Sequence, residues 1–244
     1  MTGCLDKGLV RKRITEYVYA CATVAWTPSR DFPEISERLS EGRDVTVYRK
    51  GTVYHGMPFT VYRKSSLDAF LEGCREGEYA VPENVVDVLG TDCVGYILRS
   101  VSPYMKIPMD YLSVDLLEDR RYTRPLGGVV VGAKQGSWMV RKAHSEKDFY
   151  GAYALVEPAD IVVTYFRKDF GRFIGHTRIA TGGPVVVRNS DGDIDPYRSY
   201  LVLTECKHTL TGRDSNFRVD RKFFFRSLYE NCYIPLRFVF LFDN

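Results

Sequence analysis

The sequence has no apolar run that reaches the roughly 18 residues needed to cross a bilayer, so we expect no membrane span. It has little excess charge: 34 basic and 31 acidic residues give a net charge of +3. The only basic cluster, Arg11-Lys12-Arg13, is typical of a solvated helix face, so we expect no nucleic-acid partner. Internal repeats and low-complexity tracts are missing too, and a composition that is 45% hydrophobic excludes intrinsic disorder.

The six cysteines, at positions 4, 21, 74, 93, 206 and 232, include no CxxC pair. This spacing argues against a zinc ribbon or a thioredoxin-like site, and the chain is too long for a disulfide framework. The sequence also lacks a glycine-rich phosphate loop and a G-x-S-x-G elbow. We therefore expect no cofactor.

Two partial metal patterns are present. Residues 191–202 begin like a calcium loop, but Pro196 and Val202 replace the glycine and glutamate that such a loop needs. Cys206, His208 and His176 offer an incomplete zinc ligand set. We expect no metal site from either pattern.

Apolar spacing divides the chain into a helical first part and a strand-rich second part. It predicts helices over 14–26, 31–39, 67–74 and 94–101, and strands over 129–131, 138–140, 160–166, 176–181, 200–206, 223–225 and 238–242. Helices before strands, without βαβ alternation, indicate an α+β fold with a mostly antiparallel sheet. No linker interrupts the chain, so we expect one domain over 1–244, with a helical N-terminal portion over 1–50 and a core over 50–240.

Cys93 is the candidate nucleophile. It follows Thr91 and Asp92, either of which is a good N-cap, and it precedes a mostly apolar predicted helix. Amide N–H groups at a helix start stabilise a thiolate, so a cysteine there can be reactive at neutral pH. The alternative is that Cys93 is a small buried apolar residue.

A thiolate nucleophile needs a base, and His176 is the candidate among four histidines. It shares one face of its predicted strand with Arg178 and Ala180. Glu205 closes the apolar face of the predicted strand 200–206 and is the candidate for orienting the imidazole. His208 and Asn189 remain alternatives for that third role.

Several segments, taken in order, resemble the motifs of NlpC-type papain-like cysteine peptidases. The nucleophile motif is matched by Gly-Thr-Asp-Cys-Val-Gly-Tyr-Ile-Leu (90–98), the next strand by Glu-Pro-Ala-Asp-Ile-Val-Val (157–163), and the histidine strand by Gly-His-Thr-Arg-Ile-Ala-Thr-Gly (175–182). Residues 51–60 and 233–237 resemble flanking segments of the family, so the resemblance covers about 50–240. Val94 departs from the usual serine, and Phe59 stands where a tyrosine is common.

The resemblance implies a papain-like fold in which the nucleophile-bearing helix packs on the sheet. It implies hydrolysis of a peptide amide through a thioester, with Cys93, His176 and Glu205 catalytic and a bacterial cell-wall peptide as substrate. Asp92, Tyr54 and Arg178 are then the residues expected to bind substrate. An acyl transferase or amidase with the same Cys–His pair, and a non-catalytic binding module of the same fold, remain alternatives.

The first residues contain no apolar stretch followed by small residues, as a signal peptide would. We expect a cytoplasmic protein, or a secreted or cell-envelope protein if a leader was removed.

Overall fold

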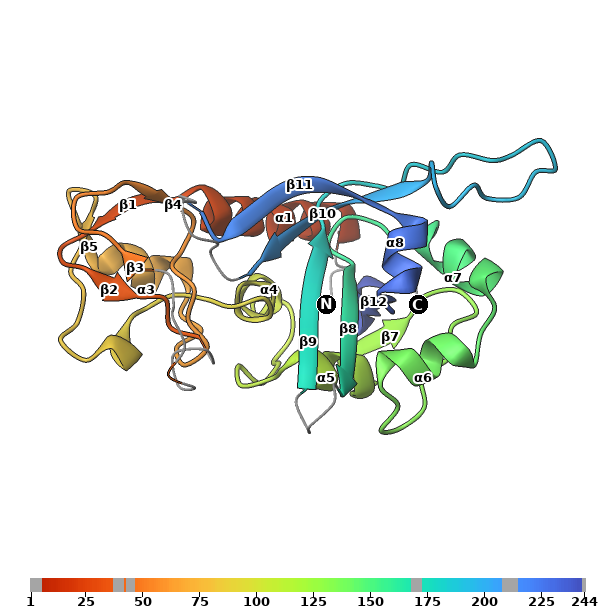
Figure 1. Cartoon of the computed structure of the whole chain (residues 1–244), viewed down its shortest axis with the longest axis horizontal. Helices are drawn as coiled ribbons and strands as arrows, with labels where there is room; N and C mark the ends of the chain where they lie inside the picture. Colours follow the sequence, from red (N-terminus) through yellow and green to blue (C-terminus); the bar gives the residue numbers. More distant parts are fainter. Residues whose placement is uncertain (1–5, 37–41, 43–46, 168–172, 208–214, 243–244) are drawn as a thin grey trace. The chain divides into compact units, whose positions relative to one another are not determined.

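The computed structural model of the chain describes residues 6–36, 42, 47–167, 173–207 and 215–242, without the side chains of 166, 167, 173 and 174 (Figure 1). The fold is α+β. The chain divides into two compact units. The aromatic unit comprises Glu16–Pro103 and Glu205–Val219, and the sheet unit comprises Met1–Thr15, Tyr104–Thr204 and Asp220–Asn244.

The first helix, α1 (Lys7–Thr23), confirms the helix predicted from residue 14, but Ala25 and Trp26 at the end of the predicted range form a strand. In the aromatic unit, a sheet has the strand order β4-β1-β6-β5, and a separate pair joins β2 to β3. The bounds are β1 (Ala25–Pro28), β2 (Phe32–Pro33), β3 (Val47–Tyr48), β4 (Tyr54–His55), α3 (Leu67–Glu72), β5 (Cys74–Arg75), β6 (Glu78–Tyr79), η1 (Val85–Asp87) and α4 (Gly95–Val101). The N-cap of α3 is Ser66, whose Oγ accepts from the Ala69 amide at 3.2 Å.

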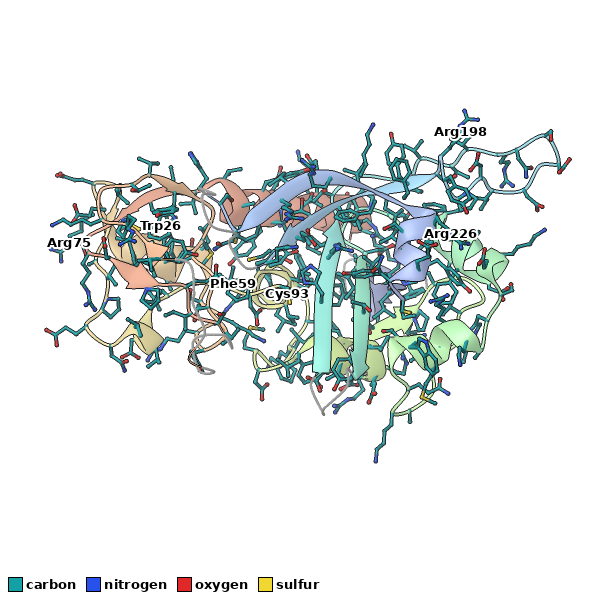
Figure 2. All side chains as sticks on the ribbon, in the orientation of Figure 1. Trp26, Phe59, Arg75, Cys93, Arg198 and Arg226 are labelled. Carbon is teal, nitrogen blue, oxygen red and sulfur yellow. The ribbon has the colours of Figure 1, made fainter. Side chains whose placement is uncertain are left out.

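Trp26 is the centre of the core of the aromatic unit (Figure 2). It is 1% exposed, and its indole Nε1 donates to the Gly56 carbonyl at 2.7 Å. Ring centroids within 6.1 Å of Trp26 belong to Phe32, Tyr48, Tyr54, Phe70 and Tyr79. These short strands therefore depend on burial of large aromatic rings for stability.

The sheet unit is built on a six-stranded sheet of order β11-β10-β9-β8-β12-β7 (Figure 1). The neighbouring pairs β10–β9, β9–β8, β8–β12 and β12–β7 are antiparallel. The bounds are α5 (Ser113–Glu118), β7 (Thr123–Pro125), α6 (Ser137–Lys142), α7 (Glu146–Tyr153), β8 (Ile161–Arg167), β9 (Phe173–Ala180), β10 (Tyr200–Cys206), β11 (Phe217–Phe224), α8 (Phe225–Glu230), β12 (Ile234–Phe238) and η3 (Val239–Leu241). Helices α5 and α6 pack against β8.

The longer predicted strands are confirmed, and several short ones are wrong. Residues 160–166, 176–181 and 200–206 fall on β8, β9 and β10. The strand predicted over 138–140 lies inside α6, and 129–131 forms no strand in the described structure. Residues 239–241 form the 3-10 helix η3 and not a strand, and Phe225 begins α8. A run of three apolar residues fits both the repeat of a helix and the alternation of a strand. Only the surrounding sequence can decide between the two.

Two further predictions need correction. The helix expected from residue 31 is wrong, because Phe32 and Pro33 form β2, in which Phe32 pairs with Tyr48. Residues 37–39 of that predicted helix lie outside the described residues. Arg11 is not on a solvated face: its side chain is 11% exposed and pairs with Asp160 at 3.1 Å.

No helix in the described part of the chain combines the length and the apolarity that a membrane crossing requires.

Candidate functional site

The loop that carries Cys93 is held by backbone hydrogen bonds on its N-terminal side. The Thr91 amide donates to the Pro58 carbonyl at 2.9 Å, and the Thr60 amide donates to the Thr91 carbonyl at 2.9 Å. The Ser65 amide donates to the Gly90 carbonyl at 2.9 Å. A Cβ atom at residue 90 would overlap the Pro58 carbonyl oxygen, so this close approach requires glycine.

Asp92 holds the other side of the loop. Its Oδ1 accepts from the Val94 amide at 3.0 Å and from the Gly95 amide at 2.6 Å. The N-cap of α4 is Val94, so the prediction that Thr91 or Asp92 occupies this position is wrong. Its Oδ2 lies 3.6 Å from Nζ of Lys64, and both side chains are less than 10% exposed. The guanidinium of Arg99 donates to the Lys64 carbonyl at 2.7 Å. The carboxylate is therefore fully engaged beside Cys93.

Cys93 is partly exposed and lies in the turn two residues before α4, in which every residue except Arg99 is buried (Figure 2). The neighbouring strand β10 places the buried Cys206 within electrostatic range of it. Burial, with Cys93 and Asp92 as lesser causes, raises the pKa of Cys206 well above its ordinary value. Cys206 is therefore a thiol that stays protonated beside Cys93.

Other cysteines of the aromatic unit offer weaker nucleophiles. Burial raises the pKa of Cys21 to about 12, and Cys21 has no exposed surface. Cys74 is partly exposed, but burial raises its pKa too, and its Sγ donates to the Phe70 carbonyl at 3.5 Å. Cys93 is thus the best placed nucleophile among the described cysteines of this unit.

Glu205 lies on β10 and is 1% exposed. Leu201 and Leu203 are buried on the same strand face, as the alternation predicts. One carboxylate oxygen of Glu205 lies 3.5 Å from Nη1 of Arg218. The sequence did not single out Arg218, because nothing in the local pattern links it to Glu205.

Tyr54 is 6% exposed within the aromatic core, and its hydroxyl accepts from the Arg49 amide at 2.9 Å. This packing gives Tyr54 a structural role, and its substrate-binding role stays a prediction. The hydroxyl beside the main chain of Phe59 belongs to Tyr48. It accepts from the Phe59 amide at 3.0 Å and donates to Oδ1 of Asn216 at 3.0 Å.

His176 and Arg178 lie on β9 in the sheet unit. His176 is partly exposed and pairs in register with Thr164 of β8. The guanidinium carbon of Arg178 lies 4.1 Å from the ring centroid of Phe223 and 4.2 Å from that of Tyr233. Two aromatic rings therefore hold this cation in place.

The candidate residues are divided between the two units. Asp92, Cys93, Tyr54 and Glu205 belong to the aromatic unit, whereas His176 belongs to the sheet unit. Cys93 and His176 belong to different units, so their pairing stays a prediction.

Asn189 and His208 are the alternatives to Glu205 for orienting the imidazole. Oδ1 of Asn189 accepts from the amides of Asp191 and Asp193 at 3.0 and 2.9 Å, so the side chain closes a turn. His208 lies outside the described residues. Within the described ranges, no three His, Cys, Asp or Glu side chains are arranged to hold a metal ion.

Comparison of the chain with family models, with curated proteins and with solved structures finds no match in any of the three.

Proposed function

We propose that the chain is a cysteine hydrolase of papain-like fold that cleaves a peptide amide, with bacterial cell-wall stem peptides as its substrate class. The observation that carries the proposal is the fixed, partly exposed position of Cys93. Backbone hydrogen bonds hold the loop before it, and Asp92 ties the loop to α4 after it. The ordered motif resemblance over 50–240 supports the papain-like assignment and the substrate class.

The charges around Cys93 are compatible with a thiolate. An uncompensated carboxylate next to a thiolate would repel it and raise its pKa. Here two amide N–H groups and Lys64 compensate the charge of Asp92. Asp92 therefore supports the nucleophile by position, and its expected contact with substrate remains a prediction.

In the proposed reaction, the Cys93 thiolate attacks the carbonyl carbon, and a C–S bond forms. The C–N bond then breaks as the imidazolium of His176 gives its proton to the leaving amine. Water attacks the thioester and passes a proton to His176, and the C–S bond breaks to release the acid and the thiolate. Glu205 would orient His176, with Arg218 as its ion-pair partner. Arg178, held between two rings, would bind a substrate carboxylate.

The first experiment measures the alkylation rate of each cysteine against pH by mass spectrometry. We expect Cys93 to react rapidly below about pH 7, as a thiolate of lowered pKa does. Cys74 is the matched control, because it is also partly exposed and its pKa is raised. His176→Ala should remove the advantage of Cys93. Equal rates at Cys93 and Cys74 in the unmodified chain would contradict the nucleophile and favour a binding module.

The second experiment follows digestion of purified muropeptides. We expect product from the unmodified chain and none from Cys93→Ala, with Cys74→Ala as active as the unmodified chain. Digestion that survives Cys93→Ala would contradict the mechanism. A reactive Cys93 that transfers acyl groups but leaves muropeptides intact would overturn the substrate class and favour the transferase.

A further inference from the structure

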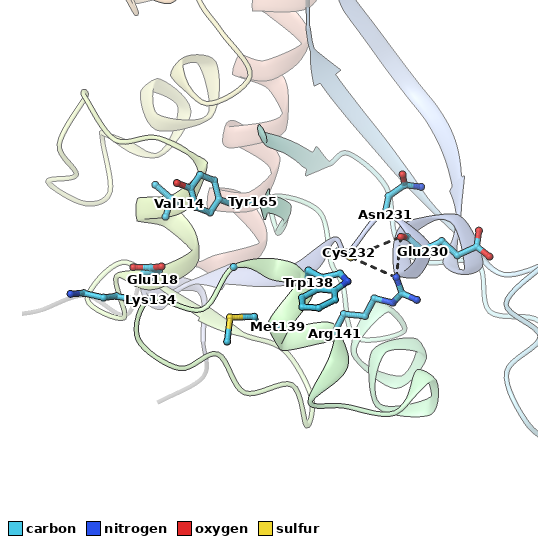
Figure 3. A pocket seen from close by; sticks show the side chains of 11 residues that line it. Val114, Glu118, Lys134, Trp138, Met139, Arg141, Tyr165, Glu230, Asn231 and Cys232 are labelled. Carbon is cyan, nitrogen blue, oxygen red and sulfur yellow. Dashed lines mark hydrogen bonds between the residues drawn. The ribbon is translucent and has the colours of Figure 1, made fainter. Parts of the chain in front are cut away.

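A pocket of about 830 Å³ lies in the sheet unit, and none of the proposed catalytic residues lines it (Figure 3). Its volume is within the range of small-molecule sites, about 300–1,000 Å³. Its walls come from α5, from α6 and the loop before it, from β8, and from the end of α8 with the two residues that follow. Nothing in the proposed hydrolase reaction uses it.

The apolar wall includes Trp138 and Met139 of α6, with Val114 and Tyr165 on the opposite side (Figure 3). Trp138 is 49% exposed and Met139 is 51% exposed, although both neighbours, Ser137 and Val140, are fully buried. Two consecutive large apolar side chains at such exposure form an unfilled apolar surface. Nζ of Lys142 lies 3.8 Å from the Trp138 ring centroid, which holds the indole in place.

A cation lies at one end of this wall. The guanidinium carbon of Arg141 is 4.6 Å from the Tyr229 ring centroid, and its Nη1 donates to the Glu230 carbonyl at 3.4 Å. No carboxylate within the described ranges pairs with Arg141. The carboxylate of Glu230, which also lines the pocket, is already paired with Arg226 at 2.7 Å. The charge of Arg141 is thus positioned by the protein without being neutralised.

The backbone after α8 supports this arrangement. Cys232 has φ of 55°, a left-handed conformation that favours glycine at the end of a helix. Its amide donates to the Tyr229 carbonyl at 3.0 Å. Glycine would adopt this backbone conformation at a lower conformational energy. Cysteine, however, places its Sγ 3.8 Å from Nη1 of Arg141 (Figure 3). Lys134, which also lines the pocket, has φ of 58°. Such strained positions are concentrated at ligand sites.

We infer that this pocket binds a small organic anion with an apolar ring. Its carboxylate binds Arg141, and its ring packs against Trp138 and Met139. Glu118 lies at the other end of the pocket, with Lys134, so the anionic group belongs at the Arg141 end (Figure 3). The site is distinct from the hydrolase residues and does not depend on the proposed function.

The test is isothermal titration calorimetry of the whole chain with 2-naphthoate, and with neutral 2-naphthalenemethanol as the matched probe. We expect one site for 2-naphthoate and at least tenfold weaker binding of the alcohol. Arg141→Gln and Trp138→Ala should each weaken naphthoate binding at least tenfold, and Arg141→Lys should restore part of it. The control is Arg198→Gln, which removes an exposed arginine of the same unit outside the pocket (Figure 2).

Thermal melting of each variant separates lost binding from lost folding. Equal binding of the acid and the alcohol, or equal effects of Arg141→Gln and Arg198→Gln, would overturn the anion site. Dimerisation in sedimentation that Trp138→Ala abolishes would assign the apolar wall to a second copy of the chain and also overturn it. Cys93 alkylation is measured separately, so failure here leaves the hydrolase proposal standing.

Discussion

At the scale of single residues, the stability of the sheet unit depends on the buried carboxylate of Asp160. It has no exposed surface, and its carboxylate pairs with Arg11 at 3.1 Å and Arg237 at 2.8 Å. It also accepts from the Glu157 amide at 2.9 Å. We expect Asp160→Asn to lower the free energy of unfolding by about 3 kcal/mol, because two largely buried cations then keep only the exposed carboxylate of Glu157 as an ion-pair partner. Chemical denaturation measures the change.

The matched control is Glu157→Gln. Glu157 contacts the same arginines, at 2.6 and 2.7 Å, but its side chain is 54% exposed. Solvent screens this charge, so the change should stay within about 1 kcal/mol. Equal losses in the two variants would show that the buried charge of Asp160 is not the stabilising element.

In the aromatic unit, the hydroxyl of Tyr48 is a buried polar group that stabilises the fold. Its hydroxyl joins the Phe59 amide to Asn216, and Nδ2 of Asn216 donates to the Met57 carbonyl at 3.0 Å. Tyr48→Phe leaves a buried amide and a buried side-chain oxygen unsatisfied, and should cost about 1–3 kcal/mol of unfolding free energy. Tyr62→Phe is the control, since Tyr62 is 53% exposed. Denaturation midpoints that are equal for both variants would contradict the role of the hydroxyl.

These residues also show which side-chain contacts could be predicted from the sequence. The hydrogen bonds from Asp92 to the next amides were predictable, because they join residues two and three positions apart in the chain. The partners of Tyr48, Arg11 and Glu205 were not, because each contact joins different segments that only the fold brings together. Composition and spacing carry no information on such pairings without the fold.

At the scale of elements, the Cys93 loop depends on Gly90. A Cβ there would meet the Pro58 carbonyl oxygen and also Cγ2 of Thr60 at 2.9 Å. We expect Gly90→Ala to separate the loop from the 58–60 segment, to cost about 1–3 kcal/mol of unfolding free energy and to slow Cys93 alkylation. Gly128→Ala is the control, because a Cβ at Gly128 meets no atom within 4 Å.

Two measurements check this prediction, chemical denaturation and the site-resolved alkylation rate at pH 7. A loss of stability without a change in the Cys93 rate would show that the close approach stabilises the unit but does not position the thiol. An unchanged stability would contradict the steric argument itself.

Elements were predictable from the sequence in proportion to their length. Strands β8, β9 and β10 are seven or eight residues long. That length gives β8 a continuous apolar run and lets β9 and β10 show an alternating period. Trp138-Met139-Val140 was wrongly predicted as a strand, because three apolar residues define no period. The two-residue strands of the aromatic unit had no signal of their own, since packing around Trp26 stabilises them.

At the scale of the whole molecule, buried thiols and phenols set the alkaline limit of stability. Burial raises the pKa of Cys21 from 9.0 to about 12, and burial likewise raises the pKa of Tyr150 to about 12. It raises the pKa of Tyr153 well above its ordinary value. In the unfolded chain these groups ionise near their ordinary pKa values, so above those values unfolding releases protons. Stability is therefore fully present below about pH 9 and declines as pH rises towards the folded pKa values.

Each such group contributes a slope of about 1.4 kcal/mol per pH unit between its unfolded and folded pKa values. For Cys21 that window extends from 9.0 to about 12. We expect urea denaturation to show a free energy of unfolding that falls across this window, and Cys21→Ala to reduce the slope by about one such contribution. Comparing slopes removes the constant cost of the cavity that the substitution leaves in the core. Cys74→Ala, at a partly exposed thiol, should reduce the slope less. A slope that Cys21→Ala leaves unchanged would contradict the prediction, because the thiol would then ionise with the same pKa in the folded and the unfolded chain.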